Sequence, residues 1–484
     1  KLRMNTKALR QKILDLAIHG KLVPQDPNDE PASVLLERIR AEKERLFKEG
    51  KIKKPKKSKA ACDKPHYPFE LPKGWEWTTV GEISWDLVYG TSKKSSSNGE
   101  IPVLRMGNIN RCGKIDWNNL VYTSDKDDIT KYSLQTNDLL FNRTNSSEWV
   151  GKTAIYKGEK TAIYAGYIVR LRVIILDADY VNFVMNSSYY RGWCNDVKTD
   201  AVNQSNINAQ KLSHFFIPIP PLNEQKRIVN ELSSWLNIIE AINKEKSDLQ
   251  STICLAKSKI LELAIHGNLV PQDSNDEPAS ELLKRINPKA EITCDNPHYG
   301  KLPKGWAVTT IKELCENING LWKGKKEPFV NVGVIRNANF TKDFQLDYSK
   351  IEYIDVEQRA FNQRHLKNGD LVVEKSGGSD NNPVGRAILY EGKDALYSFS
   401  NFTMVLRIIH KEMITSKFLY YTILAKYKQG VMRQMQTQTT GLHNLILEKY
   451  LAMPIFLPPL SEQMRITDKI EEIFASFNDI MESL

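Results

Sequence analysis

The chain of 484 residues contains a long internal repeat, and this repeat limits the possible folds more than any other feature. The segment ILDLAIHGKLVPQDPNDEPAS at 13–33 returns as ILELAIHGNLVPQDSNDEPAS at 260–280, with three differences in 21 positions. Pro-Pro-Leu-x-Glu-Gln likewise occurs at 220–225 and at 458–463. Self-similarity of this kind indicates one supersecondary architecture used twice. We therefore expect two related copies of one folding unit.

Weaker matches continue between these segments, while the intervening sequence diverges. We expect a shared scaffold that carries two different specificities. The matched stretches are 35–39 with 282–286, 63–67 with 295–299, 71–75 with 302–306, 103–109 with 334–340, 137–140 with 369–372, and 150–152 with 384–386.

A long helix is predicted after the first Pro-Pro-Leu-x-Glu-Gln segment, from about 222 to 266. Its apolar positions recur in alternating steps of four and three, which is typical of a coiled-coil seam. At 1.5 Å per residue the helix would measure roughly 65 Å. Gly267 is a natural C-cap, with Pro271 just beyond it. The seam positions are Ile228, Leu232, Trp235, Ile239, Ile242, Leu249, Ile253, Ala256, Ile260 and Leu263.

Both chain ends repeat parts of this seam. The C-terminal positions Ile466, Ile470, Ile473, Phe477, Ile480 and Leu484 match its first part, and the N-terminal positions Leu2, Thr6, Leu9, Ile13 and Leu16 match its last part. We expect a second helix assembled from the two ends, in a closed arrangement with pseudo-two-fold symmetry. The alternative is two unrelated amphipathic helices in separate domains.

The segments between the helices predict α+β domains with a mostly antiparallel or mixed sheet. Strand-like runs are expected at 101–105, 138–141 and 162–175, and again at 332–336, 370–374 and 395–409; helical stretches are expected at 180–197 and 415–435. The predicted fold class is thus α+β, with two α/β domains related by pseudo-two-fold symmetry and separated by a long antiparallel coiled coil. The expected divisions are an N-terminal helical region at 1–63, a first variable domain at 64–218, a central region at 219–296, a second variable domain at 297–456 and a C-terminal helix at 457–484.

Polar loops between the predicted strands carry side chains that can bind DNA. The net charge of +10 and the pI of about 9.0 favour a polyanionic partner. Arg pairs with guanine, and Asn or Gln with adenine, in the major groove. Ordinary polar surface turns are the alternative, because Asn, Ser and Gly favour turns. The candidate DNA-binding residues are Arg105, Asn108, Asn142, Arg143, Thr144, Ser147, Lys152, Gln204 and Asn206 in the first half, and Arg336, Asn339, Lys375, Ser376, Ser379, Asn381, Arg386, Thr440 and Asn444 in the second.

A basic stretch, KIKKPKKSK at 51–59, has no counterpart in the second half. It is interpreted either as a solvated linker or as a contact to DNA phosphates that raises affinity without specificity.

Signatures of catalysis, metal binding and membrane insertion are missing from the sequence. Gly320–Lys325 lacks the spacing and the Ser/Thr of a phosphate-binding loop. The six cysteines form no Cys-x-x-Cys pair, which indicates reduced thiols in a cytoplasmic protein without a zinc site. No apolar run approaches the roughly 20 residues of a membrane span, and residues 1–4 do not resemble a secretory signal. We expect a non-catalytic chain with no cofactor or metal of its own.

The repeated segments resemble the specificity subunit of type I restriction-modification enzymes. The resemblance rests on Leu-Ala-Ile-His-Gly-(Lys/Asn)-Leu-Val-Pro-Gln-Asp with Asn-Asp-Glu-Pro-Ala-Ser, on Pro-Pro-Leu-x-Glu-Gln, and on the Asp-Leu-(Leu/Val) and Val-Gly-(Lys/Arg) stretches. It covers essentially the whole chain. It implies two target-recognition domains, each reading one half of a split DNA site, and a role in defence against phage.

The resemblance also implies partners. These are double-stranded DNA, two methyltransferase subunits on the conserved helices, and restriction subunits that translocate DNA. S-adenosylmethionine, ATP and magnesium would then belong to the partner subunits. Two other hypotheses stay open: a specificity subunit of a methylation-only or other phage-defence system, and a symmetric protein-binding scaffold.

Overall fold

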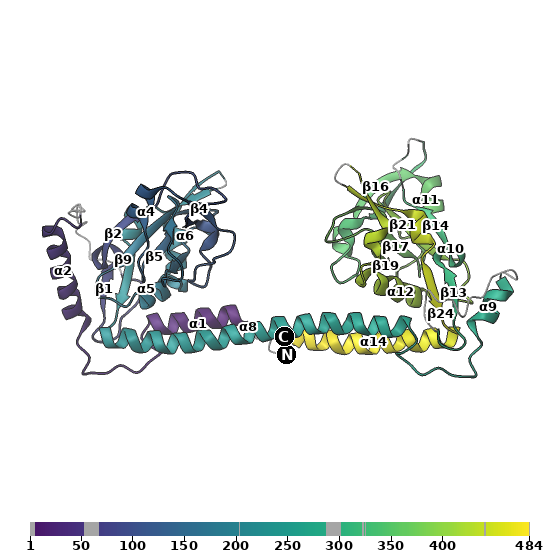
Figure 1. Ribbon diagram of the computed structural model, residues 1–484, viewed down its shortest axis with the longest axis horizontal. Helices are drawn as coiled ribbons and strands as arrows, with labels where there is room; N and C mark the ends of the chain where they lie inside the picture. The colour runs from purple at the N-terminus through teal and green to yellow at the C-terminus, as the bar shows by residue number, and fades with distance from the viewer. Residues whose placement is uncertain are drawn as a thin grey trace. The chain divides into compact units, whose positions relative to one another are not determined.

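The computed structural model describes residues 5–52, 67–202, 204–286, 302–321, 324, 326–439 and 442–483 (Figure 1). It divides into two compact units, an N-terminal unit (4–245) and a C-terminal unit (246–484). Several predictions lie outside the described residues: most of the basic stretch at 51–59, the matched stretch at 63–67 except Tyr67, its counterpart at 295–299, and the candidate Thr440.

The described residues of the N-terminal unit form four sheets. Its central sheet is antiparallel in the order β2-β9-β5-β7, and only the β3–β8 pairing in the smaller sheets is parallel. The central strands are β2 (Ser84–Tyr89), β9 (Ile168–Val173), β5 (Leu139–Asn142) and β7 (Thr153–Ile155). The smaller sheets are β4 (Val121–Thr123), β3 (Ile101–Leu104) and β8 (Ile163–Tyr164); β10 (Thr199–Ala201), β11 (Gln204–Asn206) and β6 (Thr144–Asn145); and β1 (Glu76–Thr79) with β12 (Phe216–Ile219).

The C-terminal unit repeats this topology strand for strand. Its central sheet is β14 (Cys315–Asn319), β21 (Thr403–Ile408), β17 (Leu371–Glu374) and β19 (Ala387–Leu389). The smaller sheets are β16 (Glu352–Glu357), β15 (Phe329–Ile335) and β20 (Tyr397–Phe399); β18 (Ser376–Gly378), β23 (Leu442–Leu445) and β22 (Gln436–Thr439); and β13 (Ala307–Thr310) with β24 (Pro454–Leu457). The expected α+β class with mixed, mostly antiparallel sheets is confirmed for each unit.

Helices complete both units. In the first half of the chain they are α1 (Thr6–Ile18), α2 (Ala32–Lys48), α3 (Val80–Ile83), α4 (Lys126–Tyr132), α5 (Ala178–Val184), α6 (Ser188–Val197), α7 (Ala209–Ser213) and the 3-10 turn η1 (Met106–Asn108). The long helix α8 (Leu222–Ile265) runs unbroken from one unit into the other. The rest are α9 (Ala279–Ile286), α10 (Ile311–Leu314), α11 (Gln358–Arg364), α12 (Ser416–Lys428), α13 (Leu447–Leu451), α14 (Leu460–Ser483), η2 (Asn337–Asn339), η3 (Tyr348–Lys350) and η4 (Val431–Met435).

The central strands are buried on both faces, which explains their nearly continuous apolar sequence. Leu139 and Phe141 of β5 face a large core shared with α1, α5, α6 and α8, whereas Leu140 faces a smaller core under the outer sheet. Side chains alternate along a strand, so three consecutive apolar residues fill two cores. Leu371 and Val373 likewise face one core in the second unit while Val372 faces the other.

Within each unit α8 pairs with a second helix in antiparallel direction. Thr6 of α1 hydrogen-bonds to Asn243, and Arg10, one turn later in α1, lines the same pocket as Asn237. In the C-terminal unit Lys257 donates to Asn478 of α14 at 2.7 Å, and Ala264 packs in the same core as Ile466. The predicted antiparallel coil is confirmed in both units.

Several seam positions were predicted wrongly, among them Leu249 and Ile480, which are 39% and 43% exposed. Trp235 is 41% exposed, and the neighbouring Leu236 is buried in its place. Leu263 is only half-buried, whereas Leu261 and Ala264 are buried. A straight α-helix drifts against a strict seven-residue repeat, so the buried position moves by one residue over several turns.

The longer predicted segments are interrupted. The run at 162–175 forms β8 and β9 around a turn, in which Gly166 donates to the carbonyl of Thr91, and the run at 395–409 forms β20 and β21. The stretch at 180–197 breaks between α5 and α6 because Ser187 caps α6 through Tyr190 N. The stretch at 415–435 breaks at Gly430, whose φ of 80° ends α12 and leads into η4.

Candidate nucleic-acid interface

A buried ion pair lies at the start of strand β5 in the N-terminal unit and of strand β17 in the C-terminal unit. Asp138 accepts two hydrogen bonds from the Arg172 guanidinium at 2.7 and 2.8 Å, and a third from Gln135 N at 2.8 Å. Asp370 makes the same bonds with Arg407 at 2.9 and 2.7 Å and with Lys367 N at 2.8 Å. The carboxylate of Asp138 raises the pKa of Arg172. This pair explains the repeated Asp of the Asp-Leu-(Leu/Val) stretch and anchors the strand whose end leads into the polar loops.

A second buried contact joins each variable domain to its helix. The Trp75 indole N–H donates to Glu224 Oε2 at 3.0 Å, and Trp306 donates to Glu462 at the same distance. Burial raises the pKa of Glu224, while the hydrogen bond from Trp75 opposes that shift. The next residue, Gln225, accepts from Asp177 N and donates to Pro220 O. The Glu-Gln of both copies therefore connects the first turn of the long helix with the body of the domain.

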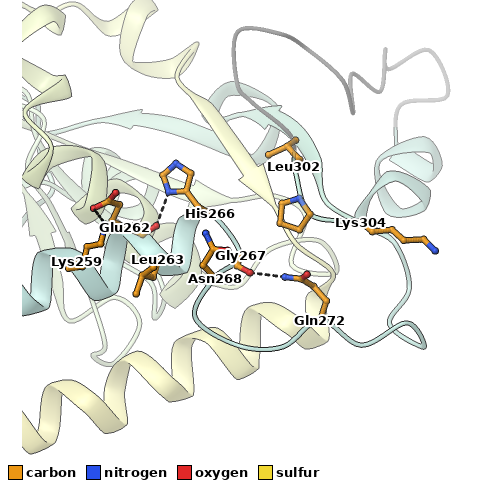
Figure 2. Close-up of a pocket in the computed structure, with 10 residues that line it drawn as sticks. Lys259, Glu262, Leu263, His266, Gly267, Asn268, Gln272, Leu302 and Lys304 are labelled. Carbon is orange, nitrogen blue, oxygen red and sulfur yellow. Dashed lines mark hydrogen bonds and ion pairs between the residues drawn. The ribbon is translucent and has the colours of Figure 1, made fainter.

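The Gln-Asp-x-Asn-Asp stretch closes the same junction. Arg227 Nη2 donates to Asp29 Oδ2 at 2.6 Å, and Arg465 Nη2 donates to Asp276 Oδ2 at 2.6 Å. Figure 2 shows the neighbouring pocket of about 640 Å³ in the C-terminal unit, where Gln272 donates to the Gly267 carbonyl at 2.7 Å. His266 Nδ1 lies 2.8 Å from Glu262 O. These polar groups form hydrogen bonds within the chain, so they stabilise the junction and do not indicate a ligand.

A larger concavity of about 1100 Å³ lies in the N-terminal variable domain, where loops of several strands meet. Polar and cationic side chains dominate its lining, with the carboxylate of Asp116 engaged by Asn118 N at 3.0 Å. Six of the predicted DNA-binding residues line it: Arg105, Asn108, Arg143, Thr144, Gln204 and Asn206. Loops far apart in sequence thus converge on one surface.

The six residues differ in how much of them is available to a ligand. Gln204 is exposed on β11, and Arg143 is partly exposed directly after β5. Arg105 Nη2 donates a hydrogen bond to the carbonyl of Asn119 at 3.0 Å. Thr144 is buried and accepts from Asn206 Nδ2 at 2.8 Å, which joins β6 to β11.

Several other candidates support the loops from inside. Asn108 and Asn339 are buried, and each accepts from the backbone N–H three residues before it at 2.9 Å, which closes η1 and η2. Lys152 donates to the carbonyls of Met106 and Ile109, and burial lowers its pKa. A DNA contact by these side chains would require them to leave these bonds.

Asn142, Arg336 and Arg386 are also engaged within the chain. Asn142 is buried and donates to Trp149 O at 3.2 Å. Arg386 forms an ion pair with Glu374 at 3.3 Å, and burial raises the pKa of Glu374 against the opposing effect of that guanidinium. Arg336 forms an ion pair with Glu352.

The remaining candidates lie on or beside the loops. Ser147 is exposed and accepts from Lys198 Nζ at 2.6 Å. Lys375 donates to Asn319 at 3.0 Å, and Ser376 pairs with Asn444 where β18 meets β23. Ser379 and Asn381 are exposed in the loop after β18. DNA contact by all of the candidates stays a prediction.

The concavity also contains residues that the sequence analysis missed. Lys93, Lys94 and Tyr167 line it, and Tyr167 is 52% exposed. Adjacent lysines in the Ser-rich stretch at 91–98 were an available signal, because a basic polar loop resembles the loops that were selected. No pattern marked Tyr167, which belongs to the unexpected turn between β8 and β9.

Three further findings concern the described part of the chain. None of its helices is long and apolar enough to cross a membrane. It contains no cluster of three or more His, Cys, Asp or Glu side chains arranged to hold a metal ion. Its cysteines, Cys112, Cys194, Cys254 and Cys315, are free thiols, as expected, whereas Cys62 and Cys294 lie outside the described residues.

Comparison with known proteins gives a consistent result. The family described as "Type I restriction modification DNA specificity domain" matches residues 72–251 and 303–484. The type I restriction enzyme EcoEI specificity subunit of Escherichia coli is 28% identical over 540 aligned positions, which cover 97% of this chain and 89% of that protein. The EcoAI specificity subunit of Escherichia coli is 29% identical over 543 positions, covering 98% and 90%.

The fold has a counterpart among solved structures. A chain from work described as "Structural basis underlying complex assembly and conformational transition of the type I R-M system" matches with a TM-score of 0.55 and 17% identity. The match covers 86% of this chain and 94% of the solved one. At this identity the likeness concerns the fold alone, and it extends over both units.

Proposed function

Because the chain belongs to the family of type I restriction modification DNA specificity domains, we propose that it reads a bipartite DNA site, with one variable domain on each half-site. The observation that carries this proposal is that both units share one set of strand pairings and buried contacts, which we call the frame, but carry unlike loops. The two units repeat twelve strands in the same pairings, and the same buried Asp–Arg and Trp–Glu contacts hold them. The loops that follow the matched strands differ in residue type, as expected for two domains that read different half-sites.

The N-terminal concavity supports DNA as the ligand. Its cationic and amide side chains offer donors for phosphates and for base edges, which are the two kinds of contact made by DNA-reading proteins. We propose that Lys93 and Lys94 contact phosphates, while Arg143, Gln204 and Asn206 face bases.

The long helix supports a role in assembly with partner proteins. Trp235 and Ile238 on α8 are 41% and 50% exposed and lie three residues apart on one helix face; Leu255 is 72% exposed further along. Large exposed apolar side chains on a helix are typical of a protein-binding surface. We propose that two methyltransferase subunits bind the helical regions and that a restriction subunit joins them. S-adenosylmethionine, ATP and magnesium would act on those partners, and this chain would contribute no catalytic residue.

We also propose that α8 determines the gap between the half-sites. It is one helix of 44 residues that contributes to both units. A continuous helix transmits its length without a hinge, so base pairs in the gap would be spanned without being read.

Coexpression with its methyltransferase subunit, followed by methylome sequencing, tests the proposed function. The expected result is one methylated motif with two short defined halves and an undefined gap. Methylation without a split motif, or no gain of methylation, would contradict it and favour the protein-binding scaffold. Copurification with a translocating restriction subunit would distinguish a restriction system from a methylation-only one.

A further inference from the structure

One pair of side chains occupies the same position in both variable domains but differs in residue type. In the N-terminal unit, Tyr89 ends β2, and Arg143 follows β5. Tyr89 pairs with Val169 of β9, which pairs with Phe141, two residues before Arg143.

The C-terminal unit has the same register. Asn319 ends β14 and pairs with Met404 of β21, which pairs with Val373, two residues before Lys375. Tyr89–Arg143 and Asn319–Lys375 are therefore equivalent pairs, which we name the head pairs.

The backbone around each cation is also equivalent. Arg143 N donates to Tyr167 O at 3.0 Å, and Arg143 O accepts from Ile207 N at 2.9 Å. Lys375 N donates to Phe402 O at 2.9 Å, and Lys375 O accepts from Leu445 N at 2.8 Å. Each cation thus projects from a junction where the central sheet meets two loops, and a change of side chain there leaves the backbone bonds intact.

The first member of each pair holds the cation. The Arg143 guanidinium carbon lies 4.8 Å from the centroid of the Tyr89 ring, a cation–π distance. The Tyr89 ring is itself fixed, because its hydroxyl accepts from Ala209 N at 3.0 Å. In the other unit Lys375 Nζ donates to Asn319 Oδ1 at 3.0 Å.

Arg143 retains donors that no group of the described chain uses. It lines the 1100 Å³ concavity, and its Nε–H is buried without a hydrogen-bond partner among the described residues. Two neighbouring cations at the same surface differ, since Lys93 forms ion pairs with Asp125 and Asp128 and Arg105 donates to Asn119 O. Other arginines of the described chain share an unpaired Nε–H, but Arg143 also lines an open cavity, so its guanidinium is placed to donate to an acceptor on the ligand.

We propose that Arg143 reads a guanine in the first half-site and that Tyr89 is the residue that positions it. A planar guanidinium matches the O6 and N7 acceptors of guanine in the major groove. Lys375, held by Asn319, occupies the equivalent position in the second half-site, where an ammonium group with two remaining N–H bonds contacts a base acceptor as a point donor. This inference rests on the proposed DNA-reading function and names the residues that carry specificity within it.

The test uses the complex with the methyltransferase subunit and a duplex bearing the methylated motif. Each guanine of the first half-site is replaced in turn by 7-deazaguanine, which lacks the N7 acceptor, and binding is measured by fluorescence anisotropy. At one position we expect the wild-type complex to lose affinity about tenfold, at the lower end of the value of a base contact. Arg143→Ala should bind both duplexes equally weakly, because the contact is already lost.

The Tyr89 variants separate positioning from a general structural role. Tyr89→Phe keeps the ring face and loses only the bond from Ala209 N, so it should retain most of the guanine discrimination. Tyr89→Leu should lower the discrimination ratio about threefold or more, in line with the loss of a cation–π contact. Tyr122→Leu, on strand β4 of another sheet, is the matched control and should leave that ratio unchanged. Thermal unfolding of each complex identifies variants that fail to fold.

Several outcomes would overturn the proposal. A first half-site without guanine, or a 7-deazaguanine effect that persists in Arg143→Ala, would do so. If Arg143→Ala weakened binding to every duplex by the same factor relative to the wild type, the 7-deazaguanine duplex included, Arg143 would be a phosphate contact instead. In each case the wild-type complex still selects its bipartite site, whereas failure of the wild type to select any duplex would refute the proposed function itself.

Discussion

Replacing Asp138 by asparagine should destabilise the N-terminal unit strongly. The Asp138 side chain is 1% exposed and the Arg172 side chain 18% exposed, so the substitution leaves a largely buried guanidinium without its counter-charge. Breaking a buried pair by removing one partner costs roughly 3–5 kcal/mol. Asparagine keeps an acceptor for Gln135 N, and Arg172 has some solvent access, so we expect about 3 kcal/mol. With a urea m-value of ~3 kcal/mol per molar, the unfolding midpoint should fall by about 1 M.

Tryptophan fluorescence during urea unfolding is a suitable assay, since seven of the nine tryptophans lie between positions 75 and 235. Asp370→Asn is the matched control, because it breaks the equivalent pair in the other unit. It should shift the fluorescence transition much less. The double variant Asp138→Asn with Arg172→Met should recover most of the loss, since replacing both charges is often nearly neutral. A midpoint shift below about 0.3 M for Asp138→Asn, or no recovery in the double variant, would refute the reasoning.

Three other predictions follow from the junction and the long helix. Burial raises the pKa of Glu224 and Glu462, so their stabilising effect is full below the ordinary value of 4.5 and is lost as pH rises through the raised pKa. The double Glu→Gln variant should therefore gain stability relative to wild type as pH rises from 4 to 7. A stability difference in urea unfolding that does not change with pH would contradict this. Replacing Trp235 and Ile238 by serine should weaken methyltransferase binding at least tenfold in titrations. Val202→Ser should not weaken it, although Val202 is 92% exposed on the variable domain. Deleting seven residues from α8 (244–250), with a matching seven from the end of α14, should shorten the gap in the methylated motif by about three base pairs, because seven helical residues span ~10 Å; an unchanged gap would exclude α8 as the spacer.

Much of the fold could be predicted because the chain contains two copies of it. The repeat identified the matched segments, the periodicity identified α8, and the short apolar runs identified β5 and β17. The interruptions at Ser187 and Gly430 were missed because a helix cap or a left-handed residue breaks a segment without changing its overall apolar pattern. The seam error at Trp235 has a similar origin, since spacing alone cannot place the buried position within one residue along a helix of 44 residues.

The candidate site was harder to predict, because sequence gives the type of a side chain but not its partner. Trp75 and Glu224 are separated by 149 positions, so nothing local showed that the repeated Glu of Pro-Pro-Leu-x-Glu-Gln accepts from an indole. Lys152 and Arg386 resembled surface cations, yet the structure uses them to hold neighbouring loop backbones. Arg143 resembled them in sequence and differs in that it lines the open concavity, with its guanidinium against the Tyr89 ring.

The distribution of similarity between the units has a physical rationale. Positions whose side chains hold backbone together, such as Asp138 and Asp370, share one residue type, because a change there leaves buried groups without partners. At the head pairs the backbone bonds are independent of the side chain, so tyrosine with arginine and asparagine with lysine are both compatible with the same local fold. Specificity can therefore diverge at these positions without cost to stability. Substitutions at the head pairs should change which sequence is bound, whereas substitutions in the frame should change whether the domain folds.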